Sequence, residues 1–239
     1  MTQILLIPGL VCDGHVWQAT HAALQPLPVQ VADVTTQPTI TVMATDLLDQ
    51  HPGPLVLMGH SMGGRVAMEM ARLAPERIRA MALLNTGMNP QGDGELPKRE
   101  AMIALCNTQG MAALADAWLP GMMAAGLDPN PAVLDGLRAM VCRMTPQIHE
   151  RQMRALLARP DARLSMPTYR RPLMLMTGRQ DIWSPIAQHQ DIAALCPQAC
   201  LEIIEDAGHF APVEQPAAVA KVLVDWVRDV LATQRPEGT

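Results

Sequence analysis

Three polar residues far apart in the chain are of the types that together perform nucleophilic catalysis, and the serine has the most informative surroundings. Ser61 lies in the pentapeptide GHSMG at 59–63, directly after the apolar run LVLM at 55–58 and directly before a segment of helical period. Glycines around a serine at a strand-to-helix turn permit a strained backbone that exposes the hydroxyl above the sheet edge. The helix N-terminus there points free amides at negative charge developing on a substrate. The pattern favours a nucleophilic serine over an ordinary turn residue.

A serine hydroxyl is a weak nucleophile at neutral pH, so this prediction requires a base and a group that orients the base. His209 follows the last expected strand and is the candidate base, whereas the ring of His60 should point away from the hydroxyl in a sharp turn. Asp181 follows the preceding strand and reaches the same edge of the sheet, so it is the favoured orienting carboxylate. Asp206 is nearer to His209 in sequence but would have to fold back onto the ring. The alternative for Asp181 is a carboxylate that caps the helix after it.

An oxyanion hole requires two amides near the nucleophile. The amide that follows the serine, that of Met62, is one candidate donor. The loop Pro8-Gly9-Leu10 leaves the first expected strand, and Gly9 can adopt the backbone geometry that turns the next amide inward. We therefore expect the amide of Leu10 to be the second donor.

Short β-branched or leucine-rich runs alternate with longer segments of helical period, which is typical of a parallel sheet wrapped by crossover helices. Strands are expected at residues 3–7, 29–33, 55–58, 80–84, 173–177 and 201–205. Helices are expected at residues 15–24, 42–50, 62–73, 185–195 and 216–231. The predicted fold class is α/β, with a mostly parallel sheet of about six strands flanked by helices.

Between the fourth and fifth expected strands the chain has methionine- and alanine-rich segments of helical character. They are expected at residues 96–107, 111–118, 133–144 and 147–157, separated by proline- and glycine-containing breaks. We interpret residues 88–166 as a helical lid inserted into a core made of residues 1–87 and 167–239. The alternative is a second helical layer with no role in binding. Each methionine of the insertion is individually expected to fill the core, whereas together the methionines are suited to forming a pliable apolar pocket.

Composition excludes several classes of function. The formal net charge is −5 and aromatic residues make up 3% of the chain, so a surface for nucleic acid or anionic membrane is not expected. No apolar run is long enough to span a bilayer, and no secretory signal is visible.

Five scattered cysteines without a Cys-x-x-Cys pair indicate inert thiols in a reducing, cytoplasmic compartment. No nucleotide, cofactor or catalytic-metal motif is present, so neither a cofactor nor a metal is expected. The oligomeric state stays open.

Taken in chain order, the Pro-Gly-Leu loop, the GHSMGG turn, the GRQD segment with Asp181 and the GHF segment with His209 resemble the α/β-hydrolase superfamily. The resemblance covers nearly the whole chain and implies a serine hydrolase of that fold. Two departures stand out: the two leading strands of the full eight-stranded sheet are not expected here, and Pro8 replaces the usual histidine of the oxyanion loop. Because position 61 is serine rather than aspartate, halide displacement is excluded.

The resemblance implies hydrolysis of a small carboxylic ester or lactone through an acyl-enzyme. Two alternatives remain open. One is hydrolysis of a carbon–carbon bond in a diketone, for which arginines of the insertion (Arg143, Arg151, Arg154 or Arg163) could hold a carboxylate or enolate. The other is a ligand receptor on the same fold in which Ser61 does not turn over.

Overall fold

Six parallel strands form the centre of the molecule. The computed structural model describes residues 2–233, so residues 1 and 234–239 of the predicted core fall outside it. The strands are β1 (Gln3–Ile7), β2 (Val29–Val31), β3 (Leu55–His60), β4 (Ile78–Leu84), β5 (Leu173–Gly178) and β6 (Ala199–Ile204). They form one sheet in the order β2-β1-β3-β4-β5-β6, and each neighbouring pair is parallel. The predicted fold class is confirmed.

The burial of each strand follows from its place in the sheet. Every residue of β3 and β5 is buried, as expected for central parallel strands covered by helices on both faces. The edge strand β6 instead alternates between exposed and more buried residues. In the centre, Leu57 of β3 lies opposite Leu5 of β1 and Met81 of β4, which places it in the middle of the core.

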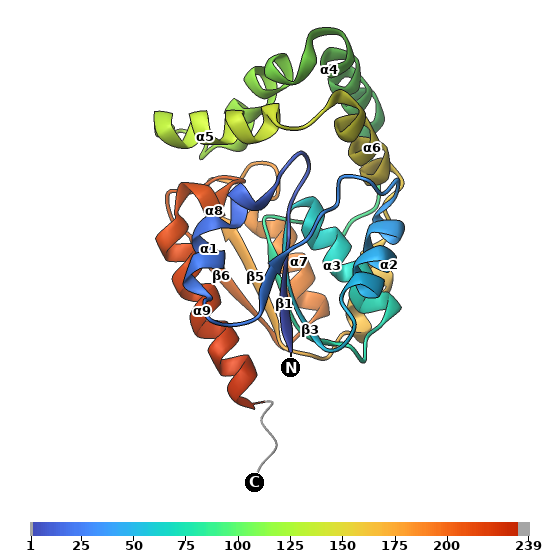
Figure 1. Ribbon diagram of the computed structural model, residues 1–239, viewed down its shortest axis with the longest axis vertical. Coiled ribbons are helices and arrows are strands. Elements are labelled where there is room, and N and C mark those ends of the chain that lie inside the picture. The colour runs from blue at the N-terminus through green and yellow to red at the C-terminus, as the bar shows by residue number, and fades with distance from the viewer. Residues whose placement is uncertain (1, 234–239) are drawn as a thin grey trace.

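Helices cover both faces of the sheet. They are α1 (Gln18–Ala23), α2 (Ile40–Gln50), α3 (Met62–Leu73), α7 (Ile186–Leu195), α8 (Ala211–Glu214) and α9 (Pro216–Thr233). Helix α1 packs against α9 on one side, and α2 packs against α3 on the other (Figure 1). The first expected helix is interrupted, because a 3-10 turn, η1 (Gly14–Trp17), precedes α1, and the short helix α8 was not predicted. Among the described helices, none has the length and apolar character that crossing a membrane requires.

The inserted segment is helical and lies over the carboxyl ends of the strands (Figure 1). Its elements are α4 (Glu95–Trp118), η2 (Leu119–Met122), α5 (Pro131–Cys142), α6 (Pro146–Leu157), η3 (Ala162–Leu164) and η4 (Met166–Thr168). The element α4 consists of two helices that meet at a kink at Gly110, where φ is 84° and ψ is 179°, in agreement with the two helices expected at 96–107 and 111–118. Asn130 and Thr145 cap α5 and α6 with their side-chain oxygens, each ahead of a proline in the first turn. The role of this segment as a lid stays a prediction.

Truncating the centre of the sheet should be costly. Leu57 is fully buried, whereas Leu164 is 80% exposed. We expect Leu57→Ala to lower the free energy of unfolding by about 2–5 kcal/mol, because it leaves a cavity in close-packed surroundings. The matched control Leu164→Ala should change it by less than about 0.5 kcal/mol. Urea denaturation measures both, and equal effects would contradict the packing described here.

Candidate active site

The turn between β3 and α3 holds Ser61 in a strained backbone conformation. Its φ is +53° and its ψ is −115°, a left-handed geometry that costs a non-glycine residue about 1–3 kcal/mol. The turn is tied down on both sides of the residue. Ser61 N donates to Leu84 O over 2.8 Å, and Thr86 Oγ1 donates to Ser61 O over 2.7 Å. These bonds, together with α3, keep the serine in a conformation that exposes its hydroxyl at the carboxyl edge of the sheet.

The glycines of this turn are required by close backbone approach. A Cβ atom on Gly59 would lie 2.4 Å from Gly63 O, and a Cβ atom on Gly63 would lie 2.1 Å from Ile7 O. Real Cβ atoms do not come so close to backbone oxygen. The start of α3 therefore packs directly on the end of β1, which brings the loop after β1 close to Ser61.

The structure brings the three sequence-predicted polar residues together. His209 Nε2 lies 2.9 Å from Ser61 Oγ, and His209 Nδ1 lies 3.0 Å from Asp181 Oδ2. An ionised carboxylate only accepts hydrogen bonds, so Nδ1 carries the proton and Nε2 is free to accept from the serine hydroxyl. His209 and Asp181 are each 3% exposed. The arrangement is a continuous hydrogen-bonded relay from the serine oxygen to a buried carboxylate.

Four donors surround the carboxylate of Asp181. Oδ2 accepts from His209 and from Asn85 Nδ2, the latter over 2.9 Å, while Oδ1 accepts from the amides of Trp183 and Ser184 over 2.9 and 2.8 Å. Burial alone would raise the pKa of this carboxyl, but the adjacent His209 ring and these hydrogen bonds outweigh it and hold the pKa well below its usual range. One oxygen of the carboxylate therefore faces the His209 ring, and the other accepts from the two amides of the turn that follows Asp181.

His60 and Asp206, the alternative candidates for the base and the orienting carboxylate, make other contacts. His60 Nε2 is 2.8 Å from the carbonyl oxygen of His209, and the ring is tilted against Phe210 with its centroid 5.5 Å away. Burial lowers the pKa of His60 to about 3, so this imidazole is neutral and donates to that carbonyl. Asp206 is exposed and has a φ of +51°. Neither residue replaces His209 or Asp181 in the relay.

The loop after β1 lies against Ser61. A Cβ atom on Gly9 would be 3.2 Å from Ser61 Cβ, so the Gly9–Leu10 peptide passes close to the serine. Leu10 is buried, with 7% of its surface exposed. On the other side of the serine, Met62 opens α3, where the first N–H groups have no partner within the helix. Both predicted oxyanion donors therefore belong to backbone that borders Ser61.

The loop that carries His209 is fixed by the inserted segment and by Glu214 of α8. His209 N donates to Met122 O over 2.8 Å. Glu214 Oε1 accepts from the amides of Gly208 and Phe210, and its Oε2 accepts from Ala124 N over 2.8 Å. Burial raises the pKa of the Glu214 carboxyl, and the three amide donors oppose that shift. The histidine is therefore held from both the core and the insertion.

Asn85 and Glu214 were not predicted from sequence. Asn85 directly follows β4, is fully buried, has a φ of +49°, and donates to Asp181 and to Gly208 O. Its position at the carboxyl end of a buried strand, like that of Asp181, was a usable signal. Glu214 follows His209 within one short segment, but nothing local in the sequence shows that its carboxylate turns back onto three amides.

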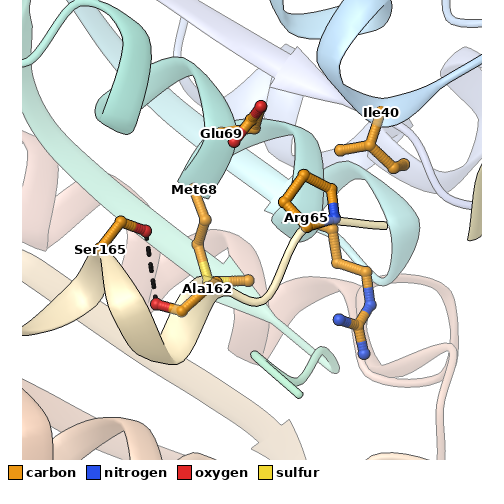
Figure 2. A pocket seen from close by; sticks show the side chains of 7 residues that line it. Ile40, Arg65, Met68, Glu69, Ala162 and Ser165 are labelled. Carbon is orange, nitrogen blue, oxygen red and sulfur yellow. Dashed lines mark hydrogen bonds between the residues drawn. The ribbon is translucent and has the colours of Figure 1, made fainter. Parts of the chain in front are cut away.

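A small cavity lies away from this site, between α2, α3 and residues 160–165 (Figure 2). It measures about 10 Å³ and is bordered by Arg65, Glu69 and Ser165 among others. A volume of that size holds about one water molecule, so the cavity does not fit an organic substrate. In the part of the chain that the structure describes, no group of three or more histidine, cysteine, aspartate or glutamate residues is placed to hold a metal ion.

Fold and sequence together define the class of protein. Residues 4–222 match the Alpha/beta hydrolase family, and the chain belongs to that family. The resemblance expected from the motifs around Ser61, Asp181 and His209 is thereby confirmed at the level of the superfamily.

Individual proteins of known name or structure share about a quarter of their residues with this chain. The chain is 27% identical over 258 residues to the Pimeloyl-[acyl-carrier protein] methyl ester esterase of Photobacterium profundum, with 95% of each chain covered. Among solved structures, it is similar to a thermophilic esterase from Thermogutta terrifontis, with a TM-score of 0.87 and 26% identity over 96% of this chain and 90% of that one. It is also similar to the enol-lactonase from Burkholderia xenovorans LB400, with a TM-score of 0.82 and 25% identity over 95% and 92% of the two chains.

The low pKa of Asp181 predicts how stability depends on pH. A carboxyl whose pKa is lower in the folded chain than in the unfolded chain stabilises the fold above its unfolded pKa, and this contribution is lost as the pH falls. We expect the free energy of unfolding of the wild-type protein to fall between about pH 5 and pH 2 more steeply than that of Asp181→Asn, which has no carboxyl to titrate at this position. Urea denaturation across this range measures the difference. Parallel curves for wild type and Asp181→Asn would contradict the lowered pKa.

Proposed function

We propose that this protein is a serine hydrolase that cleaves a small carboxylic ester or lactone through an acyl-enzyme, with Ser61, His209 and Asp181 as its catalytic triad. The observation that carries the proposal is the unbroken relay of 2.9 and 3.0 Å contacts from Ser61 Oγ through the His209 ring to Asp181. Family membership and relatives named as esterases and an enol-lactonase support a carboxylic ester hydrolase of the α/β-hydrolase type.

Acylation begins when Ser61 Oγ attacks the carbonyl carbon of the ester and His209 Nε2 takes the hydroxyl proton. The ring becomes an imidazolium, which the ionised Asp181 stabilises through Nδ1–H. The carbonyl oxygen becomes an oxyanion and accepts hydrogen bonds from the amides of Leu10 and Met62. The tetrahedral intermediate then collapses, the bond to the leaving oxygen breaks, and His209 returns the proton to that oxygen.

Deacylation repeats these steps with water. His209 Nε2 takes a proton from water, the resulting hydroxide adds to the acyl carbon, and the same two amides bind the new oxyanion. Collapse of this intermediate breaks the bond to Ser61 Oγ, which recovers its proton from His209. A lactone follows the same course, except that its alcohol and acid remain in one product molecule.

We further propose that residues 88–166 form a lid that supplies an apolar acyl-binding surface over a core of residues 1–87 and 167–239. Met122 and Met123 are both buried, and Met122 accepts the hydrogen bond from His209 N. The backbone of these two methionines thus lies against the loop that carries the proposed base. Apolar, flexible thioethers in a lid suit an acyl group better than a charged one.

Cleavage of a carbon–carbon bond in a diketo acid is less well supported. That reaction needs a free cation to hold a carboxylate or enolate. Each of the four candidate arginines already has a partner: Arg143 pairs with Asp13, Arg154 with Glu150 and Arg163 with Asp161, and Arg151 donates to Thr35 O. A receptor without turnover is disfavoured as well, because the serine, base and carboxylate stand within hydrogen-bonding distance of one another.

Replacing the proposed nucleophile tests this function directly. We expect Ser61→Ala to lower kcat/KM for p-nitrophenyl butyrate by a factor on the order of 10⁴ or more, because the acyl-enzyme can no longer form. The matched control Ser165→Ala removes a serine whose Oγ donates to Ala162 O, and it should keep wild-type activity. Circular dichroism establishes that both variants fold. Activity of Ser61→Ala within tenfold of wild type would rule out the proposed mechanism.

A further inference from the structure

We propose that Gln152 is a positioning residue for the oxyanion hole: from α6 of the insertion it fixes the backbone that follows Leu10. The side-chain oxygen Oε1 of Gln152 accepts from Val11 N over 2.8 Å, although the two residues are 141 positions apart in the chain. This inference rests on the proposed function, since it assigns a role in binding the oxyanion of the ester reaction.

The backbone at Val11 requires such a partner. Val11 has a φ of +48°, in the left-handed region that a β-branched residue rarely adopts. A residue stays in this conformation only where its surroundings hold it there. The turn is closed locally by the bond from Cys12 N to Gly9 O at 3.2 Å, and Val11 itself is fully buried. The hydrogen bond from Val11 N to Gln152 therefore orients the Leu10–Val11 peptide. The preceding peptide, Gly9–Leu10, carries the N–H that is proposed to bind the oxyanion.

Both ends of the Gln152 amide are engaged, which fixes its orientation. Nε2 donates to Val34 O over 3.0 Å, while Oε1 faces Val11 N. Because Val11 N–H can only donate and Val34 O can only accept, the amide fits in one orientation. The side chain is fully buried, so water does not replace either partner if it is removed. Gln152 thus joins three segments: the loop after β1, the loop after β2, and α6.

Neighbouring contacts between the insertion and the core do not reach the same peptide. Arg151, the preceding residue of α6, donates to Thr35 O over 2.7 Å. Arg143, which directly follows α5, pairs with Asp13, but both side chains are partly exposed, and an exposed ion pair contributes little. Among these contacts, only that of Gln152 ends on the backbone next to the proposed oxyanion donor. Arg151 is therefore a matched control for a link between insertion and core that leaves the oxyanion loop untouched.

Two substitutions separate positioning from simple packing. Gln152→Met keeps the length of the side chain but removes both hydrogen bonds. Gln152→Glu keeps an oxygen that accepts from Val11 N, but it buries a carboxyl beside Val34 O and should also be less stable than the wild type. If Gln152 positions the loop, kcat should fall only in the variant that lacks an acceptor for Val11 N. If Gln152 is merely structural, kcat should fall in proportion to the loss of stability in either variant.

The experiment measures kcat and KM for p-nitrophenyl butyrate, the inhibition constant of an alkyl trifluoromethyl ketone, and urea stability. The ketone is informative because its adduct with serine carries an oxyanion. For Gln152→Met we expect kcat to fall about tenfold to hundredfold with KM within threefold, and ketone binding to weaken by a similar factor. For Gln152→Glu we expect kcat and ketone binding within about threefold of wild type despite lower stability, and for Arg151→Met we expect wild-type values of both.

Three results would overturn the inference: wild-type kcat in Gln152→Met, equal losses in Gln152→Met and Arg151→Met, or a greater loss in Gln152→Glu than in Gln152→Met. If Gln152→Met does not fold, Gln152→Glu decides alone, and a loss of more than about tenfold in its kcat overturns the inference. Failure of the proposed function is a different result, because wild type itself would then neither hydrolyse the ester nor bind the ketone.

Discussion

The close approach of three pieces of backbone around Ser61 is the constraint on which the rest of the site depends. The end of β1, the end of β3 and the first turn of α3 meet with no room for a Cβ atom at Gly59 or Gly63. At this contact Ser61 has a φ of +53°, and the Gly9–Leu10 loop lies beside it. The proposed nucleophile and the proposed oxyanion donors are thus brought together by one packing contact. The strain at Ser61 is balanced by hydrogen bonds with buried groups on both of its sides.

The inserted helices are joined to both halves of this site. On one side Met122 accepts from His209 N and Glu214 bridges Ala124 to the histidine loop; on the other, Gln152 accepts from Val11 N. All of these bonds are buried or partly buried, and their loss would leave buried polar groups without partners. The insertion therefore contributes hydrogen bonds that fix the two loops beside Ser61, and an opening motion of the whole segment would break these bonds.

Sequence patterns predicted most of the fold and the residues that meet at the site, because each of these residues is marked by the strand directly before it in the chain. Ser61, Asp181 and His209 each follow a recognisable strand, and parallel strands deliver such residues to one edge. Asn85 carries the same signal but was not predicted. Gln152 has no comparable signal, because a glutamine within an amphipathic helix shows nothing of a partner 141 residues away. The two helices expected on either side of Gly110 are present, because the glycine leaves helical geometry there and the chain kinks between them.

The most direct test of this account is covalent trapping of the serine. A fluorophosphonate reacts with an activated serine hydroxyl, and its fluoride leaves as the bond between oxygen and phosphorus forms. We expect intact-mass spectrometry to show a single adduct, peptide mapping to place it on Ser61, and its formation to abolish hydrolysis of p-nitrophenyl butyrate. Hydrolysis that continues while the protein stays unlabelled, or an adduct that maps to another residue, would contradict the central claim that the strained turn, His209 and Asp181 activate Ser61.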